Sequence, residues 1–446
     1  MQRNICFTVV LGLILVGGAL FSGCIQKPHP ESKTSEEIAL ELVDSLNSGR
    51  YTEAHSLFNA SVTAVMSVQQ LQQIWASILQ QYGTYLGVVG TRLANDAGYV
   101  VVYVTLNFSN TGALDLRLVF DDHNLIVGMQ FVPAPTTHTY TAPEYVDLSM
   151  FDEVNVTVGS GEWALPGTMS IPKGSGPFPA VVLVQGSGSH DRDETVGPNK
   201  PFKDIAWGLA SQGIVVLRYE KRTKQYPKQS VAVANFTVQD EVIDDVLAAL
   251  DVLNVSPMVN HSRMFVLGHS LGGMLAPRIV MQDNRIAGLV FLAAPTRHLE
   301  DLYLEQMLYL SSLYTSVDEN SSQLTAVKEV VQKIKTLNIR DGENVIGAPR
   351  SYWADLATYD PVSTAKNLSI PKLFLQGKRD YQVTMTDFNT WAATFAGDPL
   401  VTLKTYDALN HLFIPGTGVP TNTEYLIEGH VAGDVVADIG AWINAH

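Results

Sequence analysis

The feature that most constrains the fold is the alternation of short apolar runs with helical stretches from about residue 146 onward. Runs that are apolar along their whole length are typical of strands buried on both faces, and intervening helices favour a parallel arrangement. The pattern therefore predicts a mostly parallel sheet covered by helices, led by a hairpin at 152–158 and 167–172. The runs lie at 180–184, 214–218, 264–267, 287–293, 372–375 and 400–406, and the helical stretches at 202–212, 238–253, 271–282, 386–395 and 434–445.

One junction between a predicted strand and a predicted helix carries chemistry. Residues 268–272 read Gly-His-Ser-Leu-Gly, directly after an apolar run and directly before a helical stretch. A turn this tight needs glycines two residues either side of Ser270, where a Cβ would meet neighbouring backbone. The pentapeptide alone is a weak signal, and its position between strand and helix makes it specific. We therefore expect Ser270 to be a nucleophile.

A serine hydroxyl attacks poorly until a base takes its proton, and that base needs an orienting carboxylate. Asp380 follows a buried strand and a glycine turn, and His411 follows the last strand, so the chain order is serine, acid, histidine. We predict that Asp380 is the acid and His411 the base. The alternatives are Asp387 and Asp407 for the acid, and His430 and His446 for the base.

The negative charge that develops on an attacked carbonyl needs two convergent backbone N–H donors. One should be Leu271, the residue after the nucleophile. The other should come from the glycine-containing loop after the strand at 180–184. We expect the N–H of Ser187 in that role, with Gly186 as the alternative.

Residues 35–134 show a different order, with helical patterns first and alternating strand patterns second. This order predicts a separate α+β domain. It is most similar to the cone-shaped nuclear transport factor 2-like fold, as found in a family of unknown function that precedes exported hydrolases. No nucleophile, metal cluster or phosphate-binding loop stands out in it, so we expect a spacer or a packing partner for residues 135–446.

The first residues of the chain carry an export pattern. Arg3 precedes an apolar run at 5–21, and Ser-Gly-Cys follows at 22–24, which resembles a lipobox. We predict a signal peptide and lipobox at 1–24, lipidation of Cys24, and a polar tether at 25–34. The alternative is an uncleaved anchor helix, for which the run is long enough. Either way, we expect an extracytoplasmic protein tethered to the membrane.

Composition removes several other classes of function. The formal net charge of −15 would repel a phosphate backbone, so we expect no nucleic acid partner. Both cysteines, Cys6 and Cys24, precede the predicted domains. The rest of the chain therefore has no disulfide framework, no cysteine zinc site and no thiol nucleophile, which leaves an oxygen nucleophile. We expect neither a metal nor a cofactor.

Several stretches together resemble the exported two-domain α/β-hydrolases of the serine aminopeptidase-like carboxylesterase group. One departure is Gln185, where many relatives carry histidine. The resemblance implies hydrolysis of short to medium acyl or aryl esters through an acyl-enzyme, without a cofactor. Two alternatives stay open: a peptidase that uses the same triad, and a surface binding module with a vestigial hydrolase domain. The stretches lie at 178–188, 191–194, 199–207, 268–273, 377–382 and 410–413.

An insertion at about 295–367 stands where such enzymes carry a lid. Its helical patterns present many apolar side chains. A lid of this kind favours an apolar substrate. The alternative is that these side chains only pack on the sheet or on the first domain.

Overall fold

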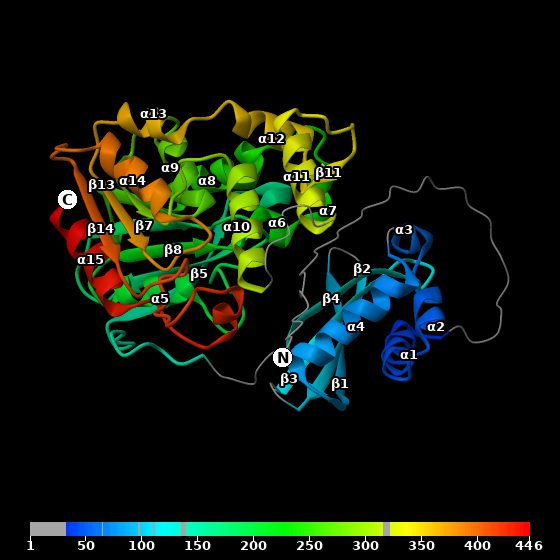
Figure 1. Ribbon diagram of the computed structural model, residues 1–446. Coiled ribbons are helices and arrows are strands. Elements are labelled where there is room, and N and C mark those ends of the chain that lie inside the picture. Colours follow the sequence, from blue (N-terminus) through cyan, green and yellow to red (C-terminus); the bar gives the residue numbers. More distant parts are fainter. Residues whose placement is uncertain (1–32, 65, 97–98, 110–111, 135–139, 315–321) are drawn as a thin grey trace. The chain divides into compact units, whose positions relative to one another are not determined.

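The computed structural model describes residues 33–446 except 65, 97–98, 110–111, 135–139 and 315–321. The described residues up to Ala134 form one compact unit, and nearly all those from Tyr140 onward form a second (Figure 1). Within these described residues, no helix is both long enough and apolar enough to span a membrane. The predicted signal peptide, Cys24 and most of the predicted tether lie outside the described residues.

The first unit packs its helices against an antiparallel sheet with strand order β1-β2-β3-β4. Its core joins α1 and α4 to the sheet through residues such as Leu42, Trp75 and Leu116. The likeness to the nuclear transport factor 2 cone stays a prediction. The elements are α1 (Ser35–Asn47), α2 (Tyr51–Ser56), α3 (Ala60–Thr63), α4 (Val68–Tyr82), β1 (Tyr85–Asp96), β2 (Tyr99–Phe108), β3 (Gly112–Phe120) and β4 (Ile126–Pro133).

The second unit is built on an eight-stranded sheet with order β14-β13-β10-β9-β7-β8-β6-β5. The strands from β14 to β8 run parallel, and the hairpin of β6 and β5 adds an antiparallel edge. This is the mostly parallel sheet that the apolar runs predict. The strands are β5 (Phe151–Val158), β6 (Leu165–Pro172), β7 (Phe178–Val184), β8 (Val215–Tyr219), β9 (Val259–His269), β10 (Ile286–Leu292), β13 (Lys372–Gly377) and β14 (Val401–Tyr406).

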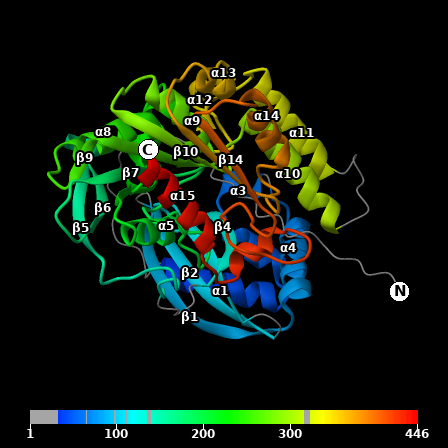
Figure 2. The same cartoon turned by 90° about the vertical axis from the view of Figure 1, so that its left-hand side faces the viewer.

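Helices cover both faces of this sheet (Figure 1, Figure 2). One apolar core lies between the sheet and α5 (Pro201–Ala210) with α15 (Gly433–Ala445). A second core lies under α8 (Asp244–Asn254), α9 (Leu271–Val280) and α14 (Met385–Thr394). Buried apolar contact on both faces explains why the central strands are apolar throughout.

Shorter elements connect these layers. Helices α6 (Arg222–Gln225) and α7 (Pro227–Ala232) follow β8, and a π-helical turn at Gln239–Ile243 leads into α8. Turns of 3-10 helix lie at Gly161–Trp163 and Asn422–Leu426. Between β10 and β13 lie α10 (Leu299–Tyr314), α11 (Ser322–Lys335), β11 (Asn344–Val345), β12 (Ala348–Pro349), α12 (Arg350–Ala357) and α13 (Pro361–Lys366).

The insertion between β10 and β13 has two parts with different surroundings. Tyr352, Trp353 and Leu356 of α12 are buried in the same core as α9. By contrast, Tyr309 and Leu310 of α10 pack against a small apolar cluster that contains Tyr381. Because Tyr381 directly follows Asp380, α10 is the part of the insertion tied to the candidate site.

Candidate active site

The turn between β9 and α9 holds Ser270 in an uncommon backbone conformation. Its φ is 51° and its ψ is −118°, a combination that few residues other than glycine adopt. A Cβ on Gly268 would collide with the carbonyl of Gly272, and a Cβ on Gly272 would collide with the carbonyl of Val184. Glycine is therefore required at both positions, as the spacing of the motif predicts. The Ser270 N–H is satisfied by the Leu292 carbonyl at 2.9 Å.

Asp380 and His411 meet after the last two parallel strands. His411 Nδ1 lies 2.7 Å from Asp380 Oδ2, and both side chains are buried. The other oxygen of Asp380 accepts the backbone N–H groups of Gln382 at 2.8 Å and Val383 at 3.0 Å. Since a carboxylate can only accept, Nδ1 carries the proton, and Nε2 is left to take one from a nucleophile.

The loop that carries His411 is shaped by a buried asparagine. Asn410 Oδ1 accepts the N–H groups of Leu412 at 3.0 Å and Ile414 at 3.2 Å. A Cβ on Gly377 would collide with the carbonyl of Leu409. The turn after β13 and the histidine loop are therefore in direct backbone contact, which sets the distance between acid and base.

The histidine pair at 269 and 411 links the base to the nucleophile turn. The two imidazole rings lie 4.6 Å apart between centroids, and His269 directly precedes Ser270. In the part of the chain that the structure describes, the Ser270 hydroxyl has no hydrogen-bond partner. Contacts between a catalytic serine and its base are often long and tighten when substrate binds.

The loop after β7 lies against the nucleophile. A Cβ on Gly186 would approach the Cβ of Ser270 to 3.1 Å. The Gly186 N–H donates to Glu194 Oε1 at 2.6 Å, so the alternative donor is already engaged. Leu271 is the first residue of α9, and N–H groups in a first helical turn have no intrahelical acceptor. Ser187 and Leu271 thus stay our predicted donor pair.

The alternative acids have other partners. Asp387 is fully buried at the start of α14, where it accepts hydrogen bonds from Thr296 and pairs with Arg297 at 2.7 Å. Asp407 is largely exposed and pairs with Lys378 at 2.6 Å. Neither carboxylate contacts a histidine among the described residues.

The alternative bases also lie elsewhere. His430 Nδ1 lies 3.1 Å from Asp204 Oδ1, beside α5. His446 Nδ1 lies 2.9 Å from the Trp442 carbonyl at the end of α15. Only His411 of the three candidates contacts an acid that follows a central parallel strand.

Two buried groups at the site were not predicted, Glu194 and His269. Glu194 Oε2 lies 3.0 Å from His269 Nδ1; the hydrogen-bond alignment is poor, and the contact is an ion pair. Burial alone would lower the pKa of His269, but the Glu194 carboxylate, the His411 carbonyl and Asp380 together raise it above its ordinary value. Burial likewise opposes the charge of Glu194, yet His269 holds its pKa below the ordinary value. His269 Nε2 donates to the His411 carbonyl at 2.9 Å.

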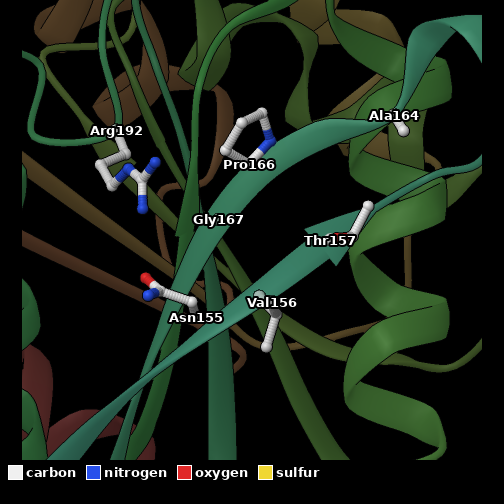
Figure 3. A pocket seen from close by; sticks show the side chains of 7 residues that line it. All are labelled: Asn155, Val156, Thr157, Ala164, Pro166, Gly167 and Arg192. Atoms are coloured by element: carbon white, nitrogen blue, oxygen red, sulfur yellow. The ribbon is translucent and has the colours of Figure 1, made fainter.

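A separate pocket lies on the β5–β6 hairpin (Figure 3). In the sheet order, β8 and β7 separate this hairpin from β9, which leads to Ser270. No predicted catalytic residue lines the pocket, so we do not assign it to the site. Within the described ranges, no three His, Cys, Asp or Glu side chains are grouped to hold a metal. The pocket is lined by Asn155, Val156, Thr157, Ala164, Pro166, Gly167 and Arg192.

A serine on a strand-to-helix turn, with an acid and a histidine after later parallel strands, defines the α/β-hydrolase class. The model of the serine aminopeptidase S33 family matches residues 179–415, and the chain belongs to this family. A family of proteins of unknown function matches residues 39–129. The chain is 41% identical over 408 residues to Esterase EstD of Thermotoga maritima, covering 92% of this chain and 95% of EstD. The predicted fold class, family and hydrolase activity are confirmed.

Solved structures of other esterases are more distant. An esterase from Pyrococcus furiosus is 17% identical, with a TM-score of 0.43 over 70% of this chain and 96% of that one. Est1E from Butyrivibrio proteoclasticus is 14% identical, with a TM-score of 0.42 over 66% of this chain and 99% of that one. Likenesses of this size bear on neither the substrate nor the site residues.

Proposed function

We propose that the protein is a serine carboxylesterase whose nucleophile is Ser270. The Ser270 oxygen attacks the ester carbonyl while His411 Nε2 takes its proton, and the alcohol leaves with that proton. Water, activated by His411, then releases the acid from the acyl-enzyme. Asp380 orients His411, and the Leu271 and Ser187 N–H groups stabilise the oxyanion. The observation that carries the proposal is the 2.7 Å contact between Asp380 and His411 in a chain 41% identical to an esterase.

The proposed substrates are short to medium acyl or aryl esters. Support comes from the apolar side chains beside the acid and the base. Tyr381 and Leu412, the neighbours of Asp380 and His411, belong to a buried cluster against which α10 packs. An acyl or aryl group placed there would lose contact with water, which favours apolar substrates.

The test replaces Ser270 with alanine and measures hydrolysis of p-nitrophenyl butyrate. We expect kcat to fall by a factor of about 10⁴ or more, as for other triad nucleophiles. Ser262→Ala, an exposed serine of the same strand β9, is the matched control and should keep full activity. A fluorophosphonate probe should label the wild type and the control, but not Ser270→Ala. Survival of most activity in Ser270→Ala would refute the assignment.

The same protein distinguishes the two other candidate functions. A peptidase would turn over aminoacyl p-nitroanilides faster than p-nitrophenyl acyl esters. A surface binding module with a vestigial hydrolase domain would form no fluorophosphonate adduct at Ser270. Either result would replace the esterase proposal.

We also propose that Cys24 is lipidated and holds the enzyme on the outer side of the cell membrane. Support comes from the apolar run at 5–21 and the Ser-Gly-Cys that follows it. Cys24→Ser should release the protein from the membrane fraction and abolish incorporation of labelled palmitate. Retention of Cys24→Ser in membranes would instead indicate an uncleaved anchor helix.

A further inference from the structure

Gly186 is held from two sides by buried charged groups. Lys221 Nζ donates to the Gly186 carbonyl at 2.7 Å, and the Gly186 N–H donates to Glu194 Oε1 at 2.6 Å. Lys221 is 2% exposed and Glu194 is 1% exposed. Hydrogen bonds with an ionised partner are about twice as strong as neutral ones. The backbone before Ser187 is therefore fixed before any substrate arrives.

The direction of the Ser187 N–H follows from these contacts. The Gly186 carbonyl and the Ser187 N–H belong to one planar trans peptide, in which the two groups point in opposite directions. Because Lys221 fixes the carbonyl, it also directs the Ser187 N–H away from itself. A positive charge on the carbonyl polarises the peptide and makes its N–H a stronger donor.

Lys221 has an acidic partner in this buried place. Its Nζ lies 2.8 Å from Glu241 Oε1, and the Tyr352 hydroxyl donates to Glu241 Oε2 at 2.7 Å. Burial raises the pKa of Tyr352, so this hydroxyl keeps its proton. A buried ion pair that is hydrogen-bonded on both sides tolerates the loss of water, whereas a single buried charge does not.

We propose that Lys221 is a positioning residue of the oxyanion hole, acting through the Gly186–Ser187 peptide. It touches no reacting atom, and Glu194 secures the opposite side of Gly186. The inference rests on the proposed function, since an oxyanion hole matters only where Ser270 forms a tetrahedral intermediate.

The test compares the wild type with the double variant Glu241→Gln, Lys221→Met, because neither protein leaves a buried charge of this pair without its partner. Active sites are first titrated to completion with a fluorophosphonate, which removes any unfolded fraction from kcat. Losing an oxyanion donor outright costs about 10²–10³ in kcat, so misdirecting one should cost about 10- to 100-fold with KM little changed. Lys224→Met, an exposed lysine of α6, is the matched control and should keep the wild-type kcat.

A second readout separates positioning from general stability. A trifluoromethyl ketone forms a tetrahedral adduct with the serine, so its affinity should weaken by the same factor as kcat/KM. A double variant whose kcat per titrated site and ketone affinity both match the wild type would overturn the inference, whatever its melting temperature. Failure of the wild type to label at Ser270 would instead overturn the proposed function.

Discussion

At the scale of single residues, Glu194 and Ser270 share an unusual property. Both are non-glycine residues with a φ of 51°, and such conformations cost of order 1–3 kcal/mol each. They persist because their neighbours hold them. The Glu194 N–H donates to the Asp191 carbonyl at 3.0 Å, while its side chain binds Gly186 and His269. These contacts, which form on folding, offset the backbone strain at Glu194 and Ser270. The site therefore has its shape before substrate binds.

The pair of Glu194 and His269 predicts a stability that depends on pH. Burial alone would lower the pKa of His269, but Glu194 raises it above its ordinary value of about 6.5. The histidine therefore stabilises the fold fully below that value, and its contribution is lost as the pH rises through the raised pKa. We expect His269→Asn to cost about 3 kcal/mol near pH 6, as for other broken buried pairs, and less near pH 9.

The measurement is urea unfolding of the second unit, comparing wild type with His269→Asn at both pH values. Titrating groups that do not interact with His269 contribute equally to both proteins, so their effects on the free energy of unfolding cancel in this difference. His261→Asn, an exposed histidine of the same strand, should show no comparable dependence. A cost that grows toward high pH would contradict the charged state assigned to His269.

At the scale of elements, α10 is anchored to the turn that carries the acid. The ring of Tyr309 stacks on that of Tyr381 with 5.3 Å between centroids, and its hydroxyl donates to the Pro420 carbonyl at 2.8 Å. Gln306 Nε2 donates to the Gln382 carbonyl at 3.0 Å. Among the described residues of the insertion, α12 is part of the core, whereas α10 contacts the turn that carries the acid, so the two helices have different surroundings.

Weakening the contacts of α10 should change KM more than kcat. Tyr309→Ala removes the ring contact, which is worth about 0.5–1.5 kcal/mol beyond its buried area. We expect KM to rise about 3- to 10-fold for longer acyl chains, with kcat little changed, in a series of p-nitrophenyl esters. Tyr309→Phe keeps the ring and should lie close to the wild type. An equal KM across the series in Tyr309→Ala would rule out a role for α10 in acyl binding.

The elements of both units could be predicted where the pattern of side chains reports burial directly. In the first unit, α4 (Val68–Tyr82) belongs to the helical patterns that the sequence predicts ahead of the strands, because its apolar face repeats at helical spacing. In β9, the apolar run 264–267 marks only part of Val259–His269. The half-buried Asn260 and the exposed His261 and Ser262 are polar, so this end of the strand looks like a loop in the sequence. The π-helical turn Gln239–Ile243 changes hydrogen bonding without changing the apolar pattern, so the sequence could not indicate it.

At the scale of the whole molecule, long-range contacts decide what the sequence can reveal about the site. Ser270, Asp380 and His411 could be proposed because each follows a recognisable strand in a known order. Lys221 follows β8, and the pairing of β7 with β8 brings it to Gly186. Glu194 lies in the same loop after β7 as Gly186, and the fold of that loop brings them together. A lysine and a glutamate in loops are usually solvated, so nothing local distinguishes these two.

The two units bury separate cores. In the described residues, every hydrophobic cluster draws its buried members from one unit: Leu42 and Trp75 belong to the first, while Val266 and Leu375 belong to the second. All residues proposed for chemistry lie in the second unit. A unit with its own core can fold without the other.

The second unit alone, residues 140–446, should therefore be an active esterase. Beginning at Tyr140 keeps the hydrogen bond from its hydroxyl to Asp204. We expect kcat/KM for p-nitrophenyl butyrate within about threefold of the full chain, because no step of the proposed reaction uses the first unit. Calorimetry of the full chain should show a transition that coincides with that of residues 140–446.

Two outcomes would contradict this prediction. If residues 140–446 fold with full probe labelling but lose turnover, the first unit contributes to catalysis. If they fail to fold, the second core depends on the first.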